Sequence, residues 1–384
     1  MKVLIFATHP IQYQVPIYQE LSKHLDLKVI YLLKQTKKGQ ADAGFGVEFE
    51  WDIPLLEGYN HEYLTNLSKN PSSSAYDGII LDKRELKAIF LKEKPEAVII
   101  HGWFPKGMKQ VINYTYQNNI PSFCRGDSTL LMTSHPLKRW LKEIYIRTIL
   151  RKINFFLYVG EENKKYYQHY GISDARLFPA LHCINTPFFQ HQFNQSESIK
   201  TNQIIHIGFA GKFIDIKQPF ILLEAVNQSR FKNQIQLVFI GDGPLRSEIE
   251  HLSKKNNINL SFLGFLNQSE IVAKGYSKID ILALPSKSET WGLVVNEVMT
   301  GGIPCIVSDK VGCNLDLIEE GETGYVFQVN NTTELTTKID LFIEKKLTNH
   351  DFKSAVLSKI ANYSLQNTVE GYLDVLKKII KNSK

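Results

Sequence analysis

The chain is poor in cysteine and lacks any long uninterrupted apolar run. Its cysteines, Cys124, Cys183, Cys305 and Cys313, show no CxxC spacing, so the sequence predicts neither a disulfide framework nor a cysteine-bound metal. No window approaches about 18 consecutive apolar residues, and a membrane-spanning helix is therefore not predicted. The opening MKVLIFATHP has an apolar run too short for a signal peptide and is typical of a buried first strand. These absences favour a reduced, cytoplasmic protein.

The chain also has no large excess of either positive or negative charge. The 45 Lys and Arg residues face 39 Asp and Glu residues, which leaves a net charge of +6. This mild excess is compatible with anionic small molecules, nucleic acid or an anionic membrane. No basic cluster accompanies a motif that reads nucleic acid, so a nucleic-acid partner is not predicted.

Short apolar runs alternate with segments of helical period almost throughout, as in βα units around parallel sheets. The chain has 384 residues, and at about 150 residues per domain the economical expectation is two α/β domains. In the first half the predicted strands are 3–7, 27–32, 97–101, 121–125 and 155–159, and the predicted helices are 16–24, 83–92, 106–116 and 136–151.

A stretch near residue 195, HQFNQSESIKTNQ, is typical of a polar linker. The βα pattern then restarts, with strands at 204–210, 236–240, 260–262, 279–284 and 305–308 and helices at 218–227 and 244–256. We therefore expect an α/β protein of two doubly wound halves with a cleft between them. The predicted domains are 1–195 and 196–364, and 365–384 form an amphipathic helix that could pack back on the first domain.

Two strand-to-helix turns of the second half carry polar side chains, and ligands of open α/β sheets bind at such turns. Gly211, Lys212 and Lys217 follow the strand of residues 204–210. Two ammonium groups there would neutralise a diphosphate, and Gly211 would let the backbone approach it. The alternative is a solvated loop. The next turn, GDGP, is predicted to be structural, with Asp242 acting within the turn or as a helix cap.

The most informative segment is LPSKSETWGLVVNEVMTGGIP, in which a buried strand runs into a turn and a helix. Glu289 lies in the turn and Glu297 lies eight residues later in the helix. Gly292 permits an exposed backbone turn, so amides at the helix start would face phosphate oxygens or sugar hydroxyls. Alternatively, both carboxylates only cap the helix and complement its dipole.

These turns, in this order, resemble the second half of a retaining glycosyltransferase of the GT-B class, family 4. The resemblance rests on GFAGKFIDIK, VFIGDGPLRSEIE, ALPSKSETWGLVVNEVMTGGIPCIVSD and GETGYVF. It implies the GT-B fold of two Rossmann-like domains facing a central cleft. It also implies a hexosyltransferase-type activity with a nucleotide diphosphate sugar as donor substrate and no cofactor. No Asp-x-Asp stands beside a strand end, so we expect no metal.

The resemblance assigns roles in the second half. Lys212 and Lys217 resemble the basic pair that holds the donor diphosphate. Glu297 resembles the second glutamate of the E-x7-E motif, which holds the ribose hydroxyls, and Glu289 resembles the first, near the donor sugar. The chain has Glu-Thr-Trp-Gly where the family more often has Glu-Gly-Phe-Gly, so Trp291 is expected to alter the sugar pocket. The predicted donor-binding residues are Gly211, Lys212, Lys217, Glu289, Trp291, Gly292, Leu293 and Glu297, and Lys212, Lys217 and Glu289 are also predicted to be catalytic.

The first half would supply the acceptor side. Asp127 falls where many family members carry a histidine that faces the reaction centre, and it is predicted to be catalytic. Arg125, His9 and His101 are further acceptor-side candidates near carboxyl ends of predicted strands, although both histidines could be structural. The motif HPIQYQVPIY resembles bacterial family members that build surface polysaccharide. A glycan or lipid-linked acceptor is therefore expected.

Residues 136–152, PLKRWLKEIYIRTILRK, combine basic residues with aromatic and aliphatic ones. The pattern predicts either peripheral contact with an anionic membrane or an ordinary helix whose apolar face packs on the first domain.

Two other functions fit the same motifs: a GT-B-type nucleotide-sugar epimerase and a non-catalytic nucleotide-sugar-binding module. An epimerase would isomerise the donor without an acceptor, and a binding module would show no turnover.

Overall fold

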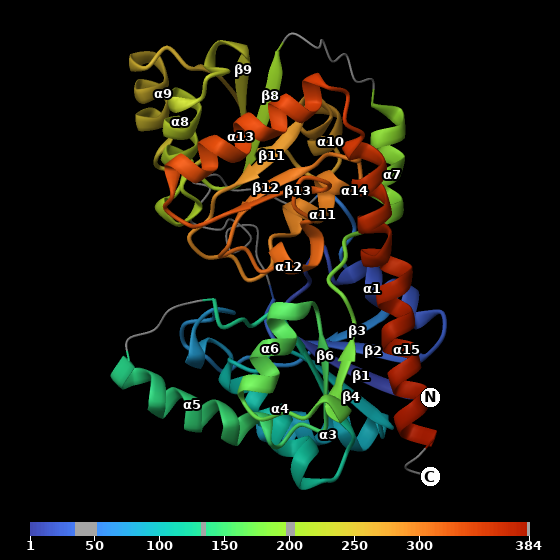
Figure 1. Ribbon diagram of the computed structural model, residues 1–384. Coiled ribbons are helices and arrows are strands. Elements are labelled where there is room, and N and C mark those ends of the chain that lie inside the picture. The colour runs from blue at the N-terminus through green and yellow to red at the C-terminus, as the bar shows by residue number, and fades with distance from the viewer. Residues whose placement is uncertain (35–51, 132–135, 197–203, 382–384) are drawn as a thin grey trace. The chain divides into compact units, whose positions relative to one another are not determined.

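The structure, a computed structural model, describes residues 1–34, 52–131, 136–196 and 204–381. Within this part, the side chains of 136–141 and 379–381 are not described. The chain folds into two compact units, shown in Figure 1. The first contains the start of the chain, residues 54–182 and the C-terminal helix, and the second contains residues 183–364.

The first unit is built on a seven-stranded parallel sheet in the order β3-β2-β1-β4-β5-β6-β7. Its strands are β1 (Lys2–Ala7), β2 (Asp26–Tyr31), β3 (Asn60–Tyr63), β4 (Ala97–His101), β5 (Ser122–Gly126), β6 (Phe155–Tyr158) and β7 (Leu177–Pro179). Its helices are α1 (Val15–Ser22), α3 (Lys83–Glu93), α4 (Lys106–Gln117), α5 (Pro136–Leu150), α6 (Glu161–His169) and α15 (Leu365–Lys381).

The second unit is built on a six-stranded parallel sheet in the order β10-β9-β8-β11-β12-β13. Its strands are β8 (Ile205–Ala210), β9 (Ile235–Ile240), β10 (Asn259–Gly264), β11 (Ile281–Leu284), β12 (Cys305–Ser308) and β13 (Gly324–Phe327). Its helices are α7 (Thr186–Gln195), α8 (Pro219–Gln228), α9 (Arg246–Lys255), α10 (Ile271–Lys274), α11 (Leu293–Met299), α12 (Asn314–Leu317), α13 (Thr332–Leu347) and α14 (Phe352–Ile360).

The central strands are nearly continuous apolar runs because both faces of a parallel sheet are covered. In β4 every residue is buried, and in β8 and β9 the described pattern is buried except for one position each. In the second unit, α8 and α13 lie side by side (Figure 1), and their buried apolar side chains belong to the same core as those of β8 and β9. The parallel strand orders and the alternation of strands and helices are the doubly wound α/β architecture that the sequence predicts, and the predicted fold class is confirmed.

Each sheet has one place where the direction of chain progression reverses. In the first unit this switch lies between β1 and β4, and in the second it lies between β8 and β11. Loops that leave neighbouring strands at such a point diverge to opposite sides of the sheet and open a crevice at the carboxyl ends. These two edges are therefore the natural places to look for ligand sites.

The structure differs from the predicted boundaries in the segment that joins the two halves. Part of the expected polar linker is helical, since α7 extends to Gln195 and its first turn is capped by Asn185, whose Oδ1 accepts a hydrogen bond from the Phe188 amide. This helix belongs to the second unit, which begins at Cys183. The polar side chains of α7 are compatible with a helix because only one face, including Phe189, needs to be buried.

The C-terminal helix belongs to the first unit. Figure 1 shows α15 beside α1, and the two helices are in contact. The Thr368 hydroxyl donates a hydrogen bond of 2.8 Å to the Leu181 carbonyl oxygen. Tyr372 on the same helix is completely buried. The amphipathic pattern of this segment thus corresponds to a helix that packs its apolar face on the first sheet's unit.

Candidate functional site

The two predicted donor-binding loops meet at the switch point of the second sheet. The loop after β8 carries Lys217, and the loop after β11 carries Glu289. Lys217 Nζ forms an ion pair and hydrogen bond with Glu289 Oε2. The two side chains are 22% and 21% exposed, so the pair remains accessible from solvent. Two residues far apart in sequence are therefore brought together where an α/β sheet binds its ligand.

A second charged pair joins the same two loops. Lys287 Nζ lies 2.6 Å from Asp215 Oδ2, and the Lys287 amide donates a 2.7 Å hydrogen bond to the Ile216 carbonyl oxygen. The Glu289 amide donates to the Lys310 carbonyl oxygen at 3.1 Å, which ties the turn to the loop after β12. Sequence reasoning missed Asp215 and Lys287. A signal was present in the sequence, because one loop carries an acidic and then a basic residue two positions apart, and the other loop carries the same charges in the opposite order. These contacts fix the Glu289 backbone and leave its carboxylate at the edge.

Backbone geometry explains the glycines in the turns after β8 and β9. Gly211 has φ of 148°, and a Cβ built on it would meet no atom within 4 Å, so its outer side is open. A Cβ on Gly241 would lie only 2.0 Å from the Gly211 carbonyl oxygen. Glycine is therefore required where the turn after β9 supports the turn after β8. Asp242 Oδ1 accepts a 2.8 Å hydrogen bond from the Gly243 amide, which confirms its predicted role within the turn.

The start of α11 is formed as the sequence predicts. Gly292 precedes the helix with φ of 97°, and the half-buried Leu293 is its first residue. No side-chain cap is bound at Gly292. Glycine has no side chain, so the N-cap residue itself supplies no hydrogen bond to the amides at the helix start.

Two of the predicted donor residues are buried more deeply than the ion pair. Glu297 is 4% exposed and accepts a 2.5 Å hydrogen bond from the Tyr276 hydroxyl. Trp291 is 3% exposed, and its indole Nε1 donates a 2.8 Å hydrogen bond to Asn296 Oδ1. The indole is part of the interior. The polar groups that Trp291 offers to the loop are therefore those of its backbone. Lys212 is half-buried on the loop that contains Gly211.

The acceptor-side candidates lie at the corresponding edge of the first sheet, where His101 ends β4. His101 is buried, with Nδ1 3.1 Å from the Tyr18 hydroxyl and Nε2 3.3 Å from the Tyr372 hydroxyl. Burial, and then the charge of Arg125, hold the pKa of His101 well below its usual range. The imidazole is thus neutral at pH 7 and hydrogen-bonded on both sides, a structural role that sequence reasoning left open.

Arg125 is also enclosed, with 3% of its surface exposed. Its Nη2 donates to the carbonyl oxygens of Ala180 and Leu181 at 3.3 and 3.5 Å, and its guanidinium carbon lies 5.7 Å from the centre of the Tyr372 ring. Among the described residues its Nε has no hydrogen-bond partner. Arg125 therefore anchors the segment after β7 and α15.

The remaining two candidates are less enclosed than Arg125. Asp127 and His9 are half-buried at the carboxyl ends of β5 and β1. His9 Nδ1 lies 3.1 Å from Thr8 Oγ1, and burial lowers the pKa of His9 to about 4. Both side chains keep part of their surface at the edge where the first sheet reverses direction. They are the acceptor-side candidates with access to solvent.

The described residues contain neither a metal-binding cluster nor a membrane-spanning helix. No group of three or more His, Cys, Asp or Glu side chains is placed to hold a metal ion. No helix in the described part is long and apolar enough to cross a membrane.

The region that carries these loops matches a known protein family. Residues 190–358 match the family of glycosyl transferases group 1. The matched glycosyltransferase region contains every predicted donor-binding residue, together with the Lys217–Glu289 pair.

Two curated relatives match part of the chain. The chain is 28% identical over 194 residues to N-acetyl-alpha-D-glucosaminyl L-malate synthase of Bacillus anthracis, covering 50% of this chain and 49% of that protein. It thus spans about half the length of that relative. It is 22% identical over 257 residues to an alpha-1,4-N-acetyl-D-galactosaminyltransferase of Campylobacter jejuni whose named substrate is linked to undecaprenol, covering 65% and 68%.

Solved structures resemble nearly the whole chain. The Anabaena protein HepE, solved in complex with UDP, matches 98% of this chain and 100% of its own with a TM-score of 0.74 and 13% identity. This likeness shows the fold, which is the GT-B fold with two Rossmann-like units.

Proposed function

We propose that the protein is a retaining, metal-independent glycosyltransferase that uses a nucleotide diphosphate sugar. The observation that carries the proposal is the Lys217–Glu289 ion pair at the switch point of the second unit, inside the region that matches group 1 glycosyl transferases. An ammonium and a carboxylate side by side suit a ligand that carries both a diphosphate and sugar hydroxyls. The UDP complex of the HepE neighbour supports a nucleotide donor.

In the proposed reaction the bond between the sugar C1 and the diphosphate oxygen breaks, and a bond from C1 to the acceptor oxygen forms on the same face. The acceptor proton passes to the departing diphosphate oxygen, so atoms and charge balance. Lys212 and Lys217 would neutralise the negative charge that develops on the leaving diphosphate. Glu289 would orient the sugar hydroxyls, and its ion pair with Lys217 would open towards the ligand as the diphosphate takes up the ammonium.

The acceptor in this proposal is a hydroxyl of a glycan or lipid-linked glycan, in surface-polysaccharide synthesis. The undecaprenol-linked substrate of the Campylobacter relative supports this class. Asp127 would face the acceptor, because it is the half-buried carboxylate at the end of β5. Arg125 and His101 already have partners within the first unit and would hold this edge in place.

Peripheral contact with an anionic membrane is a further part of the proposal. Around α5 the large side chains of Ile144, Tyr145, Phe104 and Tyr76 are 47%, 44%, 45% and 40% exposed. Lys109 Nζ lies 4.0 Å from the centre of the Tyr76 ring and 4.3 Å from that of Tyr145. Exposed aromatic and aliphatic side chains suit a lipid interface, whereas Lys109 is buried and contacts two of the rings. Of the basic residues in α5, Arg147 instead donates to the His169 carbonyl oxygen, and the side chains of 136–141 lie outside the described residues.

The central test measures donor turnover by the full chain with a panel of UDP-, GDP- and ADP-sugars. We expect one donor to raise the melting temperature and to be hydrolysed slowly without acceptor. Lys212→Ala and Glu297→Ala should markedly lower that turnover in protein that remains folded. Conversion of the donor to an epimer, or binding with no turnover under any condition, would overturn the proposal. For the membrane component, the double variant Ile144→Ser, Phe104→Ser should reduce co-sedimentation with anionic vesicles, and unchanged co-sedimentation would contradict it.

A further inference from the structure

A cavity of about 560 Å³ lies in the second unit, away from the predicted donor site. Its lining includes Asp280, which precedes β11, and Ile303 and Pro304, which precede β12. These are the amino ends of parallel strands, whereas Glu289 follows the carboxyl end of β11. A strand rises about 3.3 Å per residue, so the length of β11 alone separates the two edges by roughly 13 Å. A ligand in this cavity would not compete for the Lys217–Glu289 pair.

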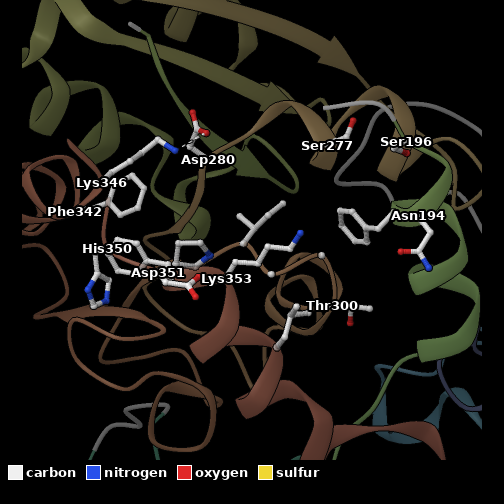
Figure 2. Close-up of a pocket in the computed structure, with 17 residues that line it drawn as sticks. Asn194, Ser196, Ser277, Asp280, Thr300, Phe342, Lys346, His350, Asp351 and Lys353 are labelled. Carbon is white, nitrogen blue, oxygen red and sulfur yellow. Dashed lines mark ion pairs between the residues drawn. The ribbon is translucent and has the colours of Figure 1, made fainter. Parts of the chain in front are cut away.

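One wall of the cavity is a fixed pair of opposite charges. The Asp280 side chain is 2% exposed, and its Oδ2 accepts a 2.8 Å hydrogen bond from the His206 amide. Its Oδ1 lies 3.2 Å from Lys346 Nζ, the ion pair drawn in Figure 2. Lys346 keeps 30% of its side chain exposed, so its ammonium can donate further hydrogen bonds to a ligand.

The facing side comes from the start of α14. Figure 2 shows the Lys353 side chain extending into the space between the two sides of the pocket. The buried ring of Phe352 belongs to the same turn, and Asp351 Oδ1 caps it by accepting a 3.1 Å hydrogen bond from the Ser354 amide. The His350 Nε2 atom is buried without a hydrogen-bond partner among the described residues, 3.5 Å from a carboxylate oxygen of Glu322.

Two consecutive glycines shape the cavity between α11 and β12. A Cβ on Gly301 would lie 2.3 Å from the Phe193 ring, and one on Gly302 would lie 2.6 Å from Lys353 Cγ. Gly302 also has φ of 76°, which disfavours any other residue. Phe193 and Lys353 can approach this turn only because it has no side chains.

The lining chemistry favours a polyhydroxylated ligand of no net charge. Two carboxylates face two ammonium groups and one imidazole, so a fully charged anion would meet nearby acidic groups as well as basic ones. A hydroxyl can donate to a carboxylate and accept from an ammonium, and so uses both. The half-buried ring of Phe193 offers apolar surface for the C–H face of a sugar ring, whereas Phe342 and Phe352 are buried and belong to the core of the unit. The cavity volume lies within the range of about 300–1,000 Å³ that small-molecule sites occupy.

We propose that this cavity binds a carbohydrate residue at a site separate from the predicted donor site. The ligand is a free sugar or one residue of a longer glycan chain, which present the same hydroxyl groups. The proposal goes beyond transferase activity and does not depend on it.

The test is ligand-observed saturation-transfer NMR on the full chain without nucleotide. The probes are the methyl glycosides of glucose, galactose and N-acetylglucosamine, with maltotriose as the oligosaccharide. Leu357→Trp, which places an indole at the exposed lining position beside Gly302, should abolish the signal. Lys353→Ala should weaken binding roughly tenfold, the effect of losing one hydrogen bond from a charged group. The matched controls Leu341→Trp on α13 and Lys255→Ala on α9, both exposed and outside the cavity, should bind as the native chain does.

The remaining outcomes distinguish a free sugar from a glycan chain, and binding in the cavity from binding at the predicted donor site. Stronger signal with maltotriose identifies a glycan chain as the occupant, and equal signal identifies a free sugar; both support the site. Glu289→Gln should leave the signal intact. Loss of signal in Glu289→Gln but not in Leu357→Trp would overturn this inference and leave the transferase proposal standing. Absence of signal from every probe, with all variants folded by circular dichroism, would also overturn it.

Discussion

The switch points of the two sheets have the same topology but use their charged residues in opposite ways. At the edge of the second unit, Lys217 and Glu289 come from two loops, pair with one another and stay partly exposed. At the edge of the first unit, His101 and Arg125 are buried and hydrogen-bonded to the unit's own segments. The same position in a doubly wound sheet can therefore present charge to a ligand or use it to hold a terminal helix.

This difference shows why position at a strand end is not enough to assign function. Both edges satisfy the rule that ligands bind beyond the carboxyl ends. Solvent access separates the two cases. In the first unit, Asp127 and His9 retain that access, and in the second unit the ion pair does.

The largest effect is expected at the exposed pair of the second unit. Lys217→Met and Glu289→Gln should each lower donor turnover by about 10²–10³-fold, the scale seen when one preorganised charge-stabilising group is removed. The free energy of unfolding should change by less than about 1 kcal/mol, because partly exposed ion pairs contribute little. Initial rates and chemical denaturation measure the two quantities. Lys287→Met, which removes the neighbouring pair with Asp215, is the control and should retain most turnover.

For Arg125 in the first unit we expect the reverse: a large loss of stability with little loss of donor turnover. Arg125→Met should lower the free energy of unfolding by about 2–3 kcal/mol, because two carbonyl oxygens lose a charged donor. Slow donor hydrolysis should persist in the folded fraction. Denaturation and hydrolysis assays on the same preparation test this, with the exposed Lys378→Met on α15 as the control. Full stability combined with lost transfer to acceptor would instead make Arg125 an acceptor contact.

His101 should make the stability of the first unit depend on pH. Its pKa is lowered in the folded state, so the unfolded chain binds the proton more tightly. The groups that interact with it include the Tyr18 and Tyr372 hydroxyls, the Arg125 guanidinium and the buried imidazole of His182, whose pKa burial also lowers. Its contribution is complete above about pH 6.5, the usual histidine pKa, and is lost as pH falls below it.

The measurement is the free energy of unfolding of the native chain and of His101→Gln between about pH 7.5 and 5.5, one unit on either side of the usual histidine pKa. The variant should be less stable at the upper end and show a shallower fall on acidification. Parallel curves for the two proteins would exclude His101 as the source of the pH dependence.

The smallest effect is expected at Trp291. Trp291→Phe removes the hydrogen bond to buried Asn296 and should cost about 1–2 kcal/mol of stability. Because the indole is interior, the ranking of donor sugars by kcat/KM should not change. A changed ranking would show that this side chain does shape the sugar pocket, as the sequence predicts.

Much of the fold could be predicted from local pattern. The run AVIIH predicts a strand at 97–101 and is β4 in the structure, and the helix predicted at 83–92 is α3 with one further residue. By contrast, β3 (NHEY) carries too few apolar residues to be recognised in sequence, and β7 (LFP) is too short. They are strands because a neighbouring strand supplies their hydrogen bonds, which is information from outside the segment.

The sequence by itself determined the order of βα units, the glycine turns and the charged residues of the donor-side loops, because each depends on a few neighbouring residues. Tertiary structure alone decided which of those residues meet. Lys217 finds Glu289 across 72 positions, and His101 finds Tyr372 across 271. It also decided burial: whether a histidine or an arginine at a strand end is a ligand contact or an internal anchor depends on what packs over it, and that packing is set by distant segments of the chain.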